Sequence, residues 1–277
     1  MKGAAFTNKV FIITGAASGI GRELALQAAQ KGASVIATDC NEAGLLETVS
    51  LAAERGHALQ HQLLDVGDRD AIARFAGTVT PALTNRKLVL INNAGVGLSS
   101  GTFRETDLAD FEWLLNINLW GAIRLTKAFY PYFFSRGEGH IVNISSVFGF
   151  IGVANNVSYC TSKFALRGFT ESLRMELKGS GINIMSVHPG GIKTNIVRNA
   201  LLKSDVVPAS VHQKSIASFD KRALTTAPSA AAQILSAIEK NKARLVIGRD
   251  GKAIDLLARM LPVFYTNILI SQMKKTF

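Results

Sequence analysis

Short apolar runs alternate along the chain with longer segments in which apolar positions recur at helical spacing. The runs are four to six residues long and rich in β-branched and other apolar side chains, as expected of strands covered on both faces. They lie at Val10–Thr14, Ser34–Thr38, Leu59–Leu64, Leu88–Ile91, His140–Ile144, Asn183–Val187 and Arg244–Ile247. The pattern therefore predicts seven buried strands.

Several of the segments between these runs carry apolar residues on one face of a helix. They include Arg22–Lys31, Asp70–Val79, Phe111–Phe134, Tyr159–Lys178 and Ser229–Lys240. Strands joined through helices pair in parallel by right-handed crossovers. We therefore predict an α/β fold with a doubly wound, Rossmann-like parallel sheet of about seven strands. No Pro/Ser-rich linker or internal repeat divides the chain, so residues 1–277 are expected to form a single domain.

The stretch Thr194–Thr226 is the least periodic part of the chain and follows the sixth predicted strand. Ligands of doubly wound sheets bind beyond the carboxyl ends of the strands. We therefore expect residues 195–226 to form a mobile substrate loop or lid. The apolar side chains in this stretch favour a hydrophobic substrate; they are Leu201, Leu202, Val206 and Val207.

The net charge is +11 at pH 7, and the surplus is concentrated near the C-terminus. From Arg198 to Phe277 there are 13 Lys or Arg residues against 5 Asp or Glu residues. No nucleic-acid-binding motif accompanies this charge, so we interpret it as a solvated face and expect no nucleic-acid partner. Residues 252–277 form a basic and apolar extension, so contact with a membrane surface is kept as an alternative. The residues that motivate it are Lys252, Arg259, Phe264, Tyr265, Lys274 and Lys275.

The N-terminal region shows no signal-peptide pattern, because its short apolar run leads directly into a glycine turn. A membrane-spanning helix is not predicted, since no uncharged apolar run reaches about 18 residues. Cys40 and Cys160 form neither a disulfide framework nor a metal-ligand cluster. These observations favour a cytoplasmic protein without a metal site.

A glycine-rich segment, Thr14-Gly15-Ala16-Ala17-Ser18-Gly19-Ile20-Gly21, follows the first predicted strand and opens the first helix. Glycines let backbone N–H groups approach a pyrophosphate, and the helix N-terminus adds favourable partial charge. The spacing G-x-x-x-G-x-G differs from the more familiar G-x-G-x-x-G, and a plain strand–helix turn would look similar. Its place after the first strand of a βαβ pattern nevertheless predicts dinucleotide binding.

Asp39 ends the second predicted strand, where an acid can accept hydrogen bonds from the adenosine ribose and repel a 2′-phosphate. NAD is therefore expected rather than NADP. Two observations temper this: Arg22 lies near the loop and could meet a phosphate, and Asp39 could simply be a turn acid or helix cap. Asp65 and Val66 follow the third strand, so they could hold the adenine, although Asp65 could equally cap the next helix.

Tyr159 and Lys163 stand four residues apart in a helical segment and therefore share a face. A neighbouring ammonium favours the phenolate form of tyrosine, whose ordinary pKa is about 10. A phenolate takes a proton from an alcohol as the hydride leaves, and the phenol returns it in the reverse direction. The bare Tyr-x-x-x-Lys pattern is also common as a surface pair, so the context decides its meaning.

Two further polar residues supply that context. Ser146 follows the strand His140–Ile144 and can orient a substrate oxygen beside Tyr159, although Ser145 is its competitor. Adjacent residues on an extended chain point in opposite directions, so one serine is expected to face the site. Asn118 lies in a helical segment after Asn92–Gly95, where its amide is either a kink that holds water or an ordinary buried hydrogen-bonding group.

These residues together resemble the short-chain dehydrogenase/reductase family over about residues 7–194. The family's motifs occur in order along the chain: Thr14–Gly21, Asn92–Gly95, Asn118, Ser146, Tyr159, Lys163 and Pro189–Thr194. The family pattern is weaker after Thr194, which leaves the substrate and the oligomer open.

The resemblance implies a role for each matched residue. Ser146, thirteen residues before Tyr159, would orient the substrate, and Tyr159 would be the acid/base. Lys163 would bind the nicotinamide ribose and lower the tyrosine pKa, and Asn118 would hold a proton-relaying water. Asp65 and Val66 would flank the adenine, and Ile192 and Thr194 would contact the nicotinamide amide. The expected cofactor contacts are Thr14, Gly15, Ser18, Gly19, Ile20, Gly21, Asp39, Asp65, Val66, Asn93, Tyr159, Lys163, Pro189, Ile192 and Thr194.

We therefore expect an NAD(H)-dependent enzyme that interconverts a secondary alcohol and a ketone, or a primary alcohol and an aldehyde. Its partner would be a small alcohol or carbonyl compound, and by family analogy it would form a homodimer or homotetramer. Two alternatives are kept. One is a peripheral membrane oxidoreductase for lipidic alcohols or ketones, and the other is a cofactor-binding regulatory protein without turnover.

Overall fold

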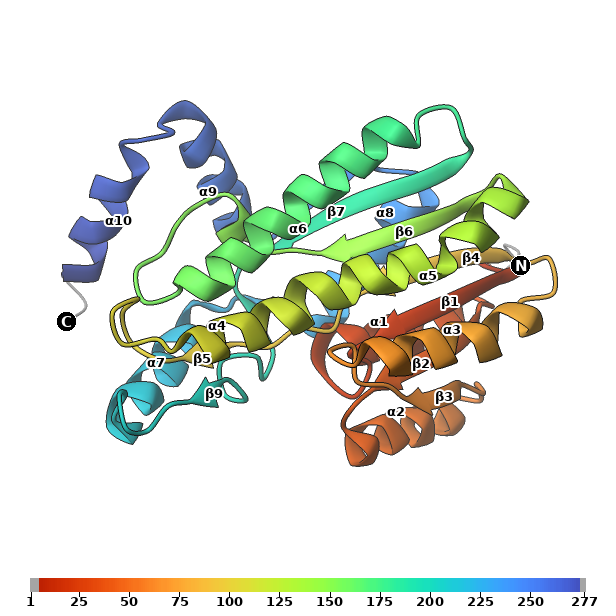
Figure 1. The fold of residues 1–277 in the computed structure, drawn as a ribbon, viewed down its shortest axis with the longest axis horizontal. Coiled ribbons are helices and arrows are strands. Elements are labelled where there is room, and N and C mark those ends of the chain that lie inside the picture. Colours follow the sequence, from red (N-terminus) through yellow and green to blue (C-terminus); the bar gives the residue numbers. More distant parts are fainter. Residues whose placement is uncertain (1–4, 275–277) are drawn as a thin grey trace.

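A computed structural model describes residues 5–274 (Figure 1). Its central sheet has seven parallel strands in the order β3-β2-β1-β4-β6-β7-β11. The strands are β1 (Lys9–Thr14), β2 (Ser34–Asp39), β3 (Gln60–Leu63), β4 (Lys87–Asn92), β6 (Gly139–Ile144), β7 (Ile182–Pro189) and β11 (Arg244–Ile247). The single domain, the parallel sheet and all seven strands predicted from the sequence are confirmed. The strand order reverses between β1 and β4, which is where ligands of such sheets bind.

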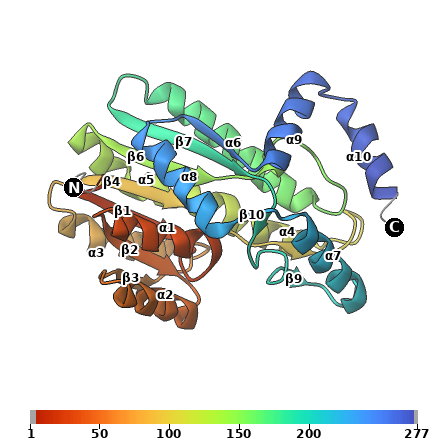
Figure 2. The same ribbon diagram turned by 180° about the vertical axis from the view of Figure 1, so that it is seen from behind.

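Helices cover both faces of the sheet (Figures 1 and 2). They are α1 (Gly19–Gln30), α2 (Glu42–Glu54), α3 (Arg69–Ala82), α4 (Leu108–Leu115), α5 (Gly121–Arg136), α6 (Val157–Glu176), α7 (Ala209–Arg222), α8 (Ala227–Glu239), α9 (Arg249–Met260) and α10 (Tyr265–Lys274). In β1, Phe11 and Ile13 face one core while Val10 and Ile12 face the other. This alternation follows from the two-residue repeat of a strand.

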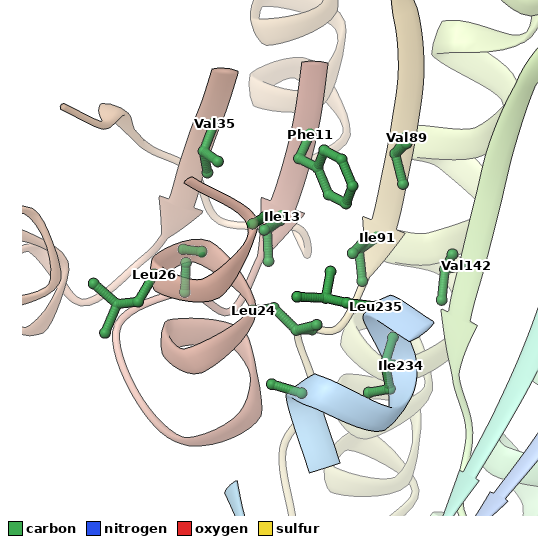
Figure 3. Packing of buried hydrophobic residues seen from close by; sticks show 14 of the residues in the cluster. Phe11, Ile13, Leu24, Leu26, Val35, Val89, Ile91, Val142, Ile234 and Leu235 are labelled. Carbon is green, nitrogen blue, oxygen red and sulfur yellow. The ribbon is translucent and has the colours of Figure 1, made fainter. Parts of the chain in front are cut away.

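The first core lies between the sheet and helices α1 and α8 (Figure 3). Leu24 of α1 and Ile234 of α8 are fully buried against strand residues such as Ile13. The second core lies under α3, α5 and α6, with Phe75 and Phe129 in edge-to-face contact at 6.0 Å between ring centroids. Packing on both faces fixes the sheet, and the sheet in turn fixes the loops at its carboxyl edge.

The predicted helix Phe111–Phe134 is interrupted by one wide turn. Residues Asn116–Trp120 form a π-helical turn between α4 and α5. Such turns often mark functional positions, and Asn118 lies within this one. Helix α2 was not predicted from the sequence, because it buries only Leu45, Thr48 and Ala52 and therefore lacks a strong apolar stripe.

The stretch 195–226 is more regular than the sequence analysis predicted. It contains the two-residue strand β9 (Leu201–Leu202), the 14-residue helix α7 and the strand β10 (Thr225–Thr226). Strand β9 pairs with β5 (Leu98–Ser99), and β10 pairs with β8 (Ile192–Lys193). Helix α7 buries only two side chains, so its apolar periodicity is weak in the sequence.

Helices α9 and α10 project from one end of the molecule (Figures 1 and 2). At the corner between them, five consecutive residues are exposed, from Met260 to Phe264. Lys275, which belongs to the predicted extension 252–277, lies outside the described residues. Within residues 5–274, none of the helices has the length and apolar character needed to cross a bilayer.

Candidate active site

The glycine-rich segment joins β1 to α1 at the point where the strand order reverses. The Thr14 Oγ1 atom accepts the backbone N–H groups of Asn93 and Ala94, both at 3.0 Å. The Asn93 amide in turn donates to the carbonyl oxygens of Thr14 and Gly15, at 2.9 and 3.1 Å. Asn93, predicted to contact a cofactor, thus has an observed role in holding this segment against the end of β4.

The segment leaves no room for side chains where the chain folds back on itself. Gly15 has a φ of +68°, and a Cβ at Gly21 would overlap the Gly15 carbonyl oxygen. Ser18, the residue before α1, makes no side-chain hydrogen bond to the first turn. The N-terminus of α1 therefore presents backbone N–H groups without a side-chain acceptor from its own cap, as an anion site requires. These features fit the pyrophosphate of a dinucleotide.

Asp39 lies beside this segment at the end of β2. Its carboxylate accepts hydrogen bonds from the backbone N–H groups of Ala17 and Asn41, each at 2.9 Å. The Arg22 guanidinium pairs with Glu47 at 2.6 Å, donates to Thr48 at 3.1 Å and donates to the Ala17 carbonyl oxygen at 2.5 Å. Both Asp39 and Arg22 therefore contact the loop at Ala17, and the charge of Arg22 is balanced by Glu47.

The pair Asp65 and Val66 follows β3. The Asp65 carboxylate accepts the Gly67 N–H at 2.7 Å, and Val66 is buried. The cap of α3 is Asp68, which accepts the N–H groups of Asp70 and Ala71. The alternative interpretation of Asp65 as that helix cap was therefore wrong, because the cap lies three residues further along.

Ser146 and Ser145 diverge after β6, as expected for neighbours on an extended chain. The Ser145 hydroxyl is buried and donates to the Lys163 carbonyl oxygen at 2.9 Å. The Ser146 Oγ atom accepts the Phe148 N–H at 3.1 Å, and its side chain acts to lower the pKa of Tyr159. Ser146, and not Ser145, is therefore the serine that influences the tyrosine.

Tyr159 and Lys163 lie close together near the first turn of α6. The Lys163 Nζ atom is 5.5 Å from the Tyr159 ring centroid and donates to the Ile144 carbonyl oxygen at 3.1 Å. Burial raises the pKa of Tyr159 to about 12, with the Ser146 hydrogen bond acting in the opposite direction. Burial also lowers the pKa of Lys163 to about 8. The protein's own groups therefore keep the phenol protonated at neutral pH.

Asn118 is tied to the loop after β4. Its side chain accepts the Val96 N–H at 2.7 Å and donates to the Val96 carbonyl oxygen at 2.9 Å. A Cβ at Gly95 would lie 3.2 Å from the Asn118 Oδ1 atom and 3.4 Å from the Lys163 Nζ atom. The backbone of Gly95 thus lies beside both side chains, and Asn118 fixes the loop that passes Lys163.

The turn after β7, which we call the 189–194 turn (Pro189–Thr194), returns to the glycine-rich segment. Ile192 is buried, and a Cβ added to Gly19 would lie 3.2 Å from the Thr194 Cγ2 atom. The loops after β1, β4, β6 and β7 therefore meet at one edge of the sheet, and they carry most of the predicted site residues.

Two residues near the site were missed by the sequence analysis. His188 is fully buried in β7; its Nδ1 atom is 3.1 Å from the Ser146 carbonyl oxygen and its Nε2 atom 2.8 Å from the Ser186 Oγ atom. Asp250, in the first turn of α9, accepts the Gly191 N–H at 2.6 Å. Neither belongs to a recognisable motif, because each acts through contacts between segments distant in the sequence.

Comparison with known proteins decides the family. The sequence profile of the short chain dehydrogenases matches residues 9–204. The chain belongs to the short-chain dehydrogenase/reductase family. Members of this family are oxidoreductases that bind nicotinamide cofactors, and the matched range contains all of the site residues predicted from the sequence.

Relatives and solved structures extend the likeness to nearly the whole chain. SadH of Mycobacterium tuberculosis, named as an oxidoreductase, is 38% identical over 277 residues, covering 99% of this chain and 98% of SadH. A short-chain dehydrogenase/reductase from Burkholderia phymatum, solved with NAD, has a TM-score of 0.79 and 25% identity, covering 96% of both chains. A metagenomic short-chain oxidoreductase, solved with NADP, has a TM-score of 0.71 and 26% identity, covering 88% of this chain and 98% of the other.

Proposed function

We propose that this short-chain dehydrogenase/reductase interconverts an alcohol and its ketone or aldehyde with NAD(H). The observation that carries the proposal is the grouping of Ser146, Tyr159 and Lys163 beside the glycine-rich segment. When bound, the nicotinamide would supply or accept the hydride. A small alcohol or carbonyl compound would be the substrate. The family resemblance supports a homodimer or homotetramer, and we propose that the enzyme works in the cytoplasm.

The protonation state of Tyr159 suits the reductive direction. A phenol with a pKa near 12 is neutral at pH 7 and can donate its proton to the oxygen of a ketone. Ser146 is placed to hold the same oxygen through its hydroxyl. In the oxidative direction the phenol must lose its proton first. We predict that Lys163 and the positive nicotinamide ring together lower the pKa of Tyr159 when the cofactor is bound.

The charge on Asp39 favours NAD over NADP. A 2′-phosphate placed at the end of β2 would meet a carboxylate, while the Arg22 guanidinium is already paired with Glu47. We expect Asp39→Asn to raise the NADPH-to-NADH ratio of kcat/KM by about ten- to a hundredfold, because the repulsion is removed. Steady-state reduction of one ketone with each cofactor measures the ratio.

Glu42→Gln is the matched control for this variant, because it removes an exposed carboxylate at the start of α2, three residues away. Its ratio is expected to equal that of the wild type. A wild-type enzyme that turns over faster with NADPH would contradict the role given to Asp39.

The substrate is proposed to be hydrophobic. Strand β9 pairs with β5 near the loop that Asn118 holds, and it brings Leu201 and Leu202 to this side of the molecule. The stretch 195–226 would serve as the substrate loop, anchored by β9, β10 and the Lys203–Asp110 ion pair at 3.0 Å. Activity that rises with alkyl chain length across a panel of ketones would support this, and a preference for polyols would exclude it.

A second candidate is an oxidoreductase that works at a membrane surface on lipidic substrates. The specific observation is the exposed corner between α9 and α10, where Val263 is 71% and Phe264 66% exposed. Exposed apolar groups beside a basic residue are typical of interfacial binding, and Arg259 in the last turn of α9 lies next to this corner. We expect the protein to pellet with vesicles of anionic phospholipid at low ionic strength, and a Val263→Ser/Phe264→Ser variant to stay in the supernatant.

Leu224→Ser is the control for vesicle binding, because Leu224 is 76% exposed but precedes β10 rather than lying at this corner. It should pellet like the wild type. Absence of wild-type binding to anionic vesicles would remove the membrane candidate and leave the enzymatic proposal intact.

A further inference from the structure

The 189–194 turn is held in place by three segments from the C-terminal part of the chain. Gly190 donates its N–H to the Ile247 carbonyl oxygen at 2.9 Å, as the continuation of the β7–β11 pairing. The Gly191 carbonyl oxygen accepts the Thr225 N–H at 3.4 Å. The Gly191 N–H goes to the Asp250 carboxylate at 2.6 Å, the shortest of the three contacts.

The packing around Asp250 is too close for any side chain on the facing backbone. A Cβ at either Gly190 or Gly248 would collide with the Asp250 carboxylate. A Cβ at Gly251 would lie 3.4 Å from the Gly190 backbone nitrogen. Gly190 and Gly248 thus leave room for the Asp250 carboxylate, and Gly251 lies in contact with the backbone of Gly190. A side chain at Gly190 or Gly248 would displace the carboxylate from this position.

The opposite end of the 189–194 turn meets the glycine-rich segment, where Thr194 lies against Gly19. The 189–194 turn therefore lies between α9 on one side and the glycine-rich segment on the other. A charge-assisted hydrogen bond to a backbone N–H is among the stronger single contacts of this kind. Its loss would leave the Gly191 N–H without its acceptor and the turn with one fewer anchor.

We infer that Asp250 is a positioning residue that holds the 189–194 turn in the shape required at the nicotinamide end of the cofactor site. The inference rests on the proposed function, which assigns Ile192 and Thr194 to that end. Helix α9 then belongs to the cofactor site, although it lies beyond the range matched by the family profile. Asp250 does not touch the reacting atoms; it acts through the backbone of Gly191.

The test compares two ligands that share all but the nicotinamide end. NADH occupies the whole site, whereas ADP-ribose keeps both riboses and the pyrophosphate but lacks the nicotinamide ring, the group assigned to Ile192 and Thr194. We expect Asp250→Ala to weaken NADH binding by about tenfold and to leave ADP-ribose binding within about twofold of the wild type. Asp250→Asn keeps one acceptor oxygen, so it is expected to recover most of the NADH affinity. Isothermal titration calorimetry measures the six dissociation constants of the wild type and the two variants for the two ligands.

Asp255→Asn is the matched control, because it removes another carboxylate from the same helix. Asp255 pairs with Arg244 at 2.6 Å and Arg259 at 3.0 Å, away from the 189–194 turn. This variant should bind both ligands as the wild type does. General destabilisation would lower the melting temperature of both the Asp250 and the Asp255 variants, but it would leave the ratio of the NADH and ADP-ribose dissociation constants unchanged. That ratio therefore separates a positioning role from general destabilisation.

Two results would overturn the inference: equal weakening of NADH and ADP-ribose by Asp250→Ala, or no weakening of either. If Asp250→Ala does not fold, the ratio of NADH and ADP-ribose affinities is measured instead on Asp250→Asn and on Asp250→Ser, which has a shorter side chain. A ratio equal to that of the wild type in both variants would overturn the inference. Failure of the wild type to bind NADH would contradict the proposed function itself, a result distinct from wild-type binding that Asp250 does not affect.

Discussion

Tyr159→Phe is expected to lower kcat by about 10²- to 10⁴-fold in both directions of the reaction, which is the usual contribution of a positioned acid/base. The phenyl ring keeps the edge-to-face contact with Phe148, whose ring centroid is 6.0 Å away, so the fold should be preserved. Only the proton-bearing oxygen and its hydrogen bond to Ser146 are lost. Cofactor-linked absorbance at saturating NADH and ketone measures the change, and NADH binding should remain within about threefold of the wild type.

Tyr130→Phe is the control, because it removes a tyrosine hydroxyl from α5, on a different helix. Its kcat should equal that of the wild type. Full turnover by Tyr159→Phe would contradict the acid/base assignment. Absence of turnover in the wild type, with NADH binding retained, would instead favour the alternative of a cofactor-binding regulatory protein.

Acidification is expected to destabilise the protein between about pH 6.5 and pH 4, before most carboxylates titrate. Burial lowers the pKa of His140 and of His188 from 6.5 to about 4. Neighbouring cations act in the same direction, namely Lys87 and Lys9 for His140 and Arg244 and Arg167 for His188. Both histidines are neutral in the folded state over this range.

The sign follows from proton binding in the two states. Above about pH 6.5 both states hold neutral histidine, and stability is complete. As the pH falls towards 4, the two histidines bind protons in the unfolded chain but stay largely neutral in the folded chain, so the free energy of unfolding decreases. Each histidine accounts for about 3 kcal/mol of this loss, and the loss levels off below about pH 4. Urea unfolding at several pH values measures it.

His188→Gln provides the decisive comparison for this acid sensitivity. The variant loses the ring packed on Phe150 at 4.1 Å between centroids and is less stable at pH 7, but one of the two titrating groups is gone. Its further loss of stability between pH 7 and pH 4 should be about half that of the wild type. His61→Gln, at an exposed position, should change nothing. Equal pH slopes in His188→Gln and the wild type would contradict the account.

The seven strands were predictable because the sheet is covered on both faces. Each strand then needs a nearly continuous apolar run, and such runs are visible without any knowledge of the fold. Helix α2 was missed for the opposite reason. It lies at the margin of the domain and buries only three side chains, so its sequence lacks the stripe of a core helix. Helix α7 escaped notice in the same way within the stretch 195–226.

In the candidate site too, some features follow from short sequence patterns, and others depend on contacts between segments that are distant in the sequence. The glycine-rich segment and the Tyr159–Lys163 pair are local patterns, and their chemistry was predicted from their spacing together with their place among the predicted strands and helices. The residues alone left Ser145 and Ser146 open, and the family resemblance favoured Ser146. The fold supplies the physical reason, because the Ser145 hydroxyl is turned to the Lys163 carbonyl oxygen. The raised pKa of Tyr159 could not be predicted either, since it depends on how completely the surrounding segments exclude water.

The α/β class, the number of parallel strands, the glycine-rich segment and the candidate acid/base could be predicted from the sequence, because each depends on patterns among residues that are close together along the chain. The fold was needed to show how the 189–194 turn is held, which groups keep His188 neutral and where Asp250 acts. Gly191 and Asp250 are 59 residues apart, and their contact depends on the pairing of β7 with β11 and on the room that Gly190 and Gly248 leave for the Asp250 carboxylate. Contacts of that kind depend on the packing of the whole domain, so spacing along the chain does not reveal them.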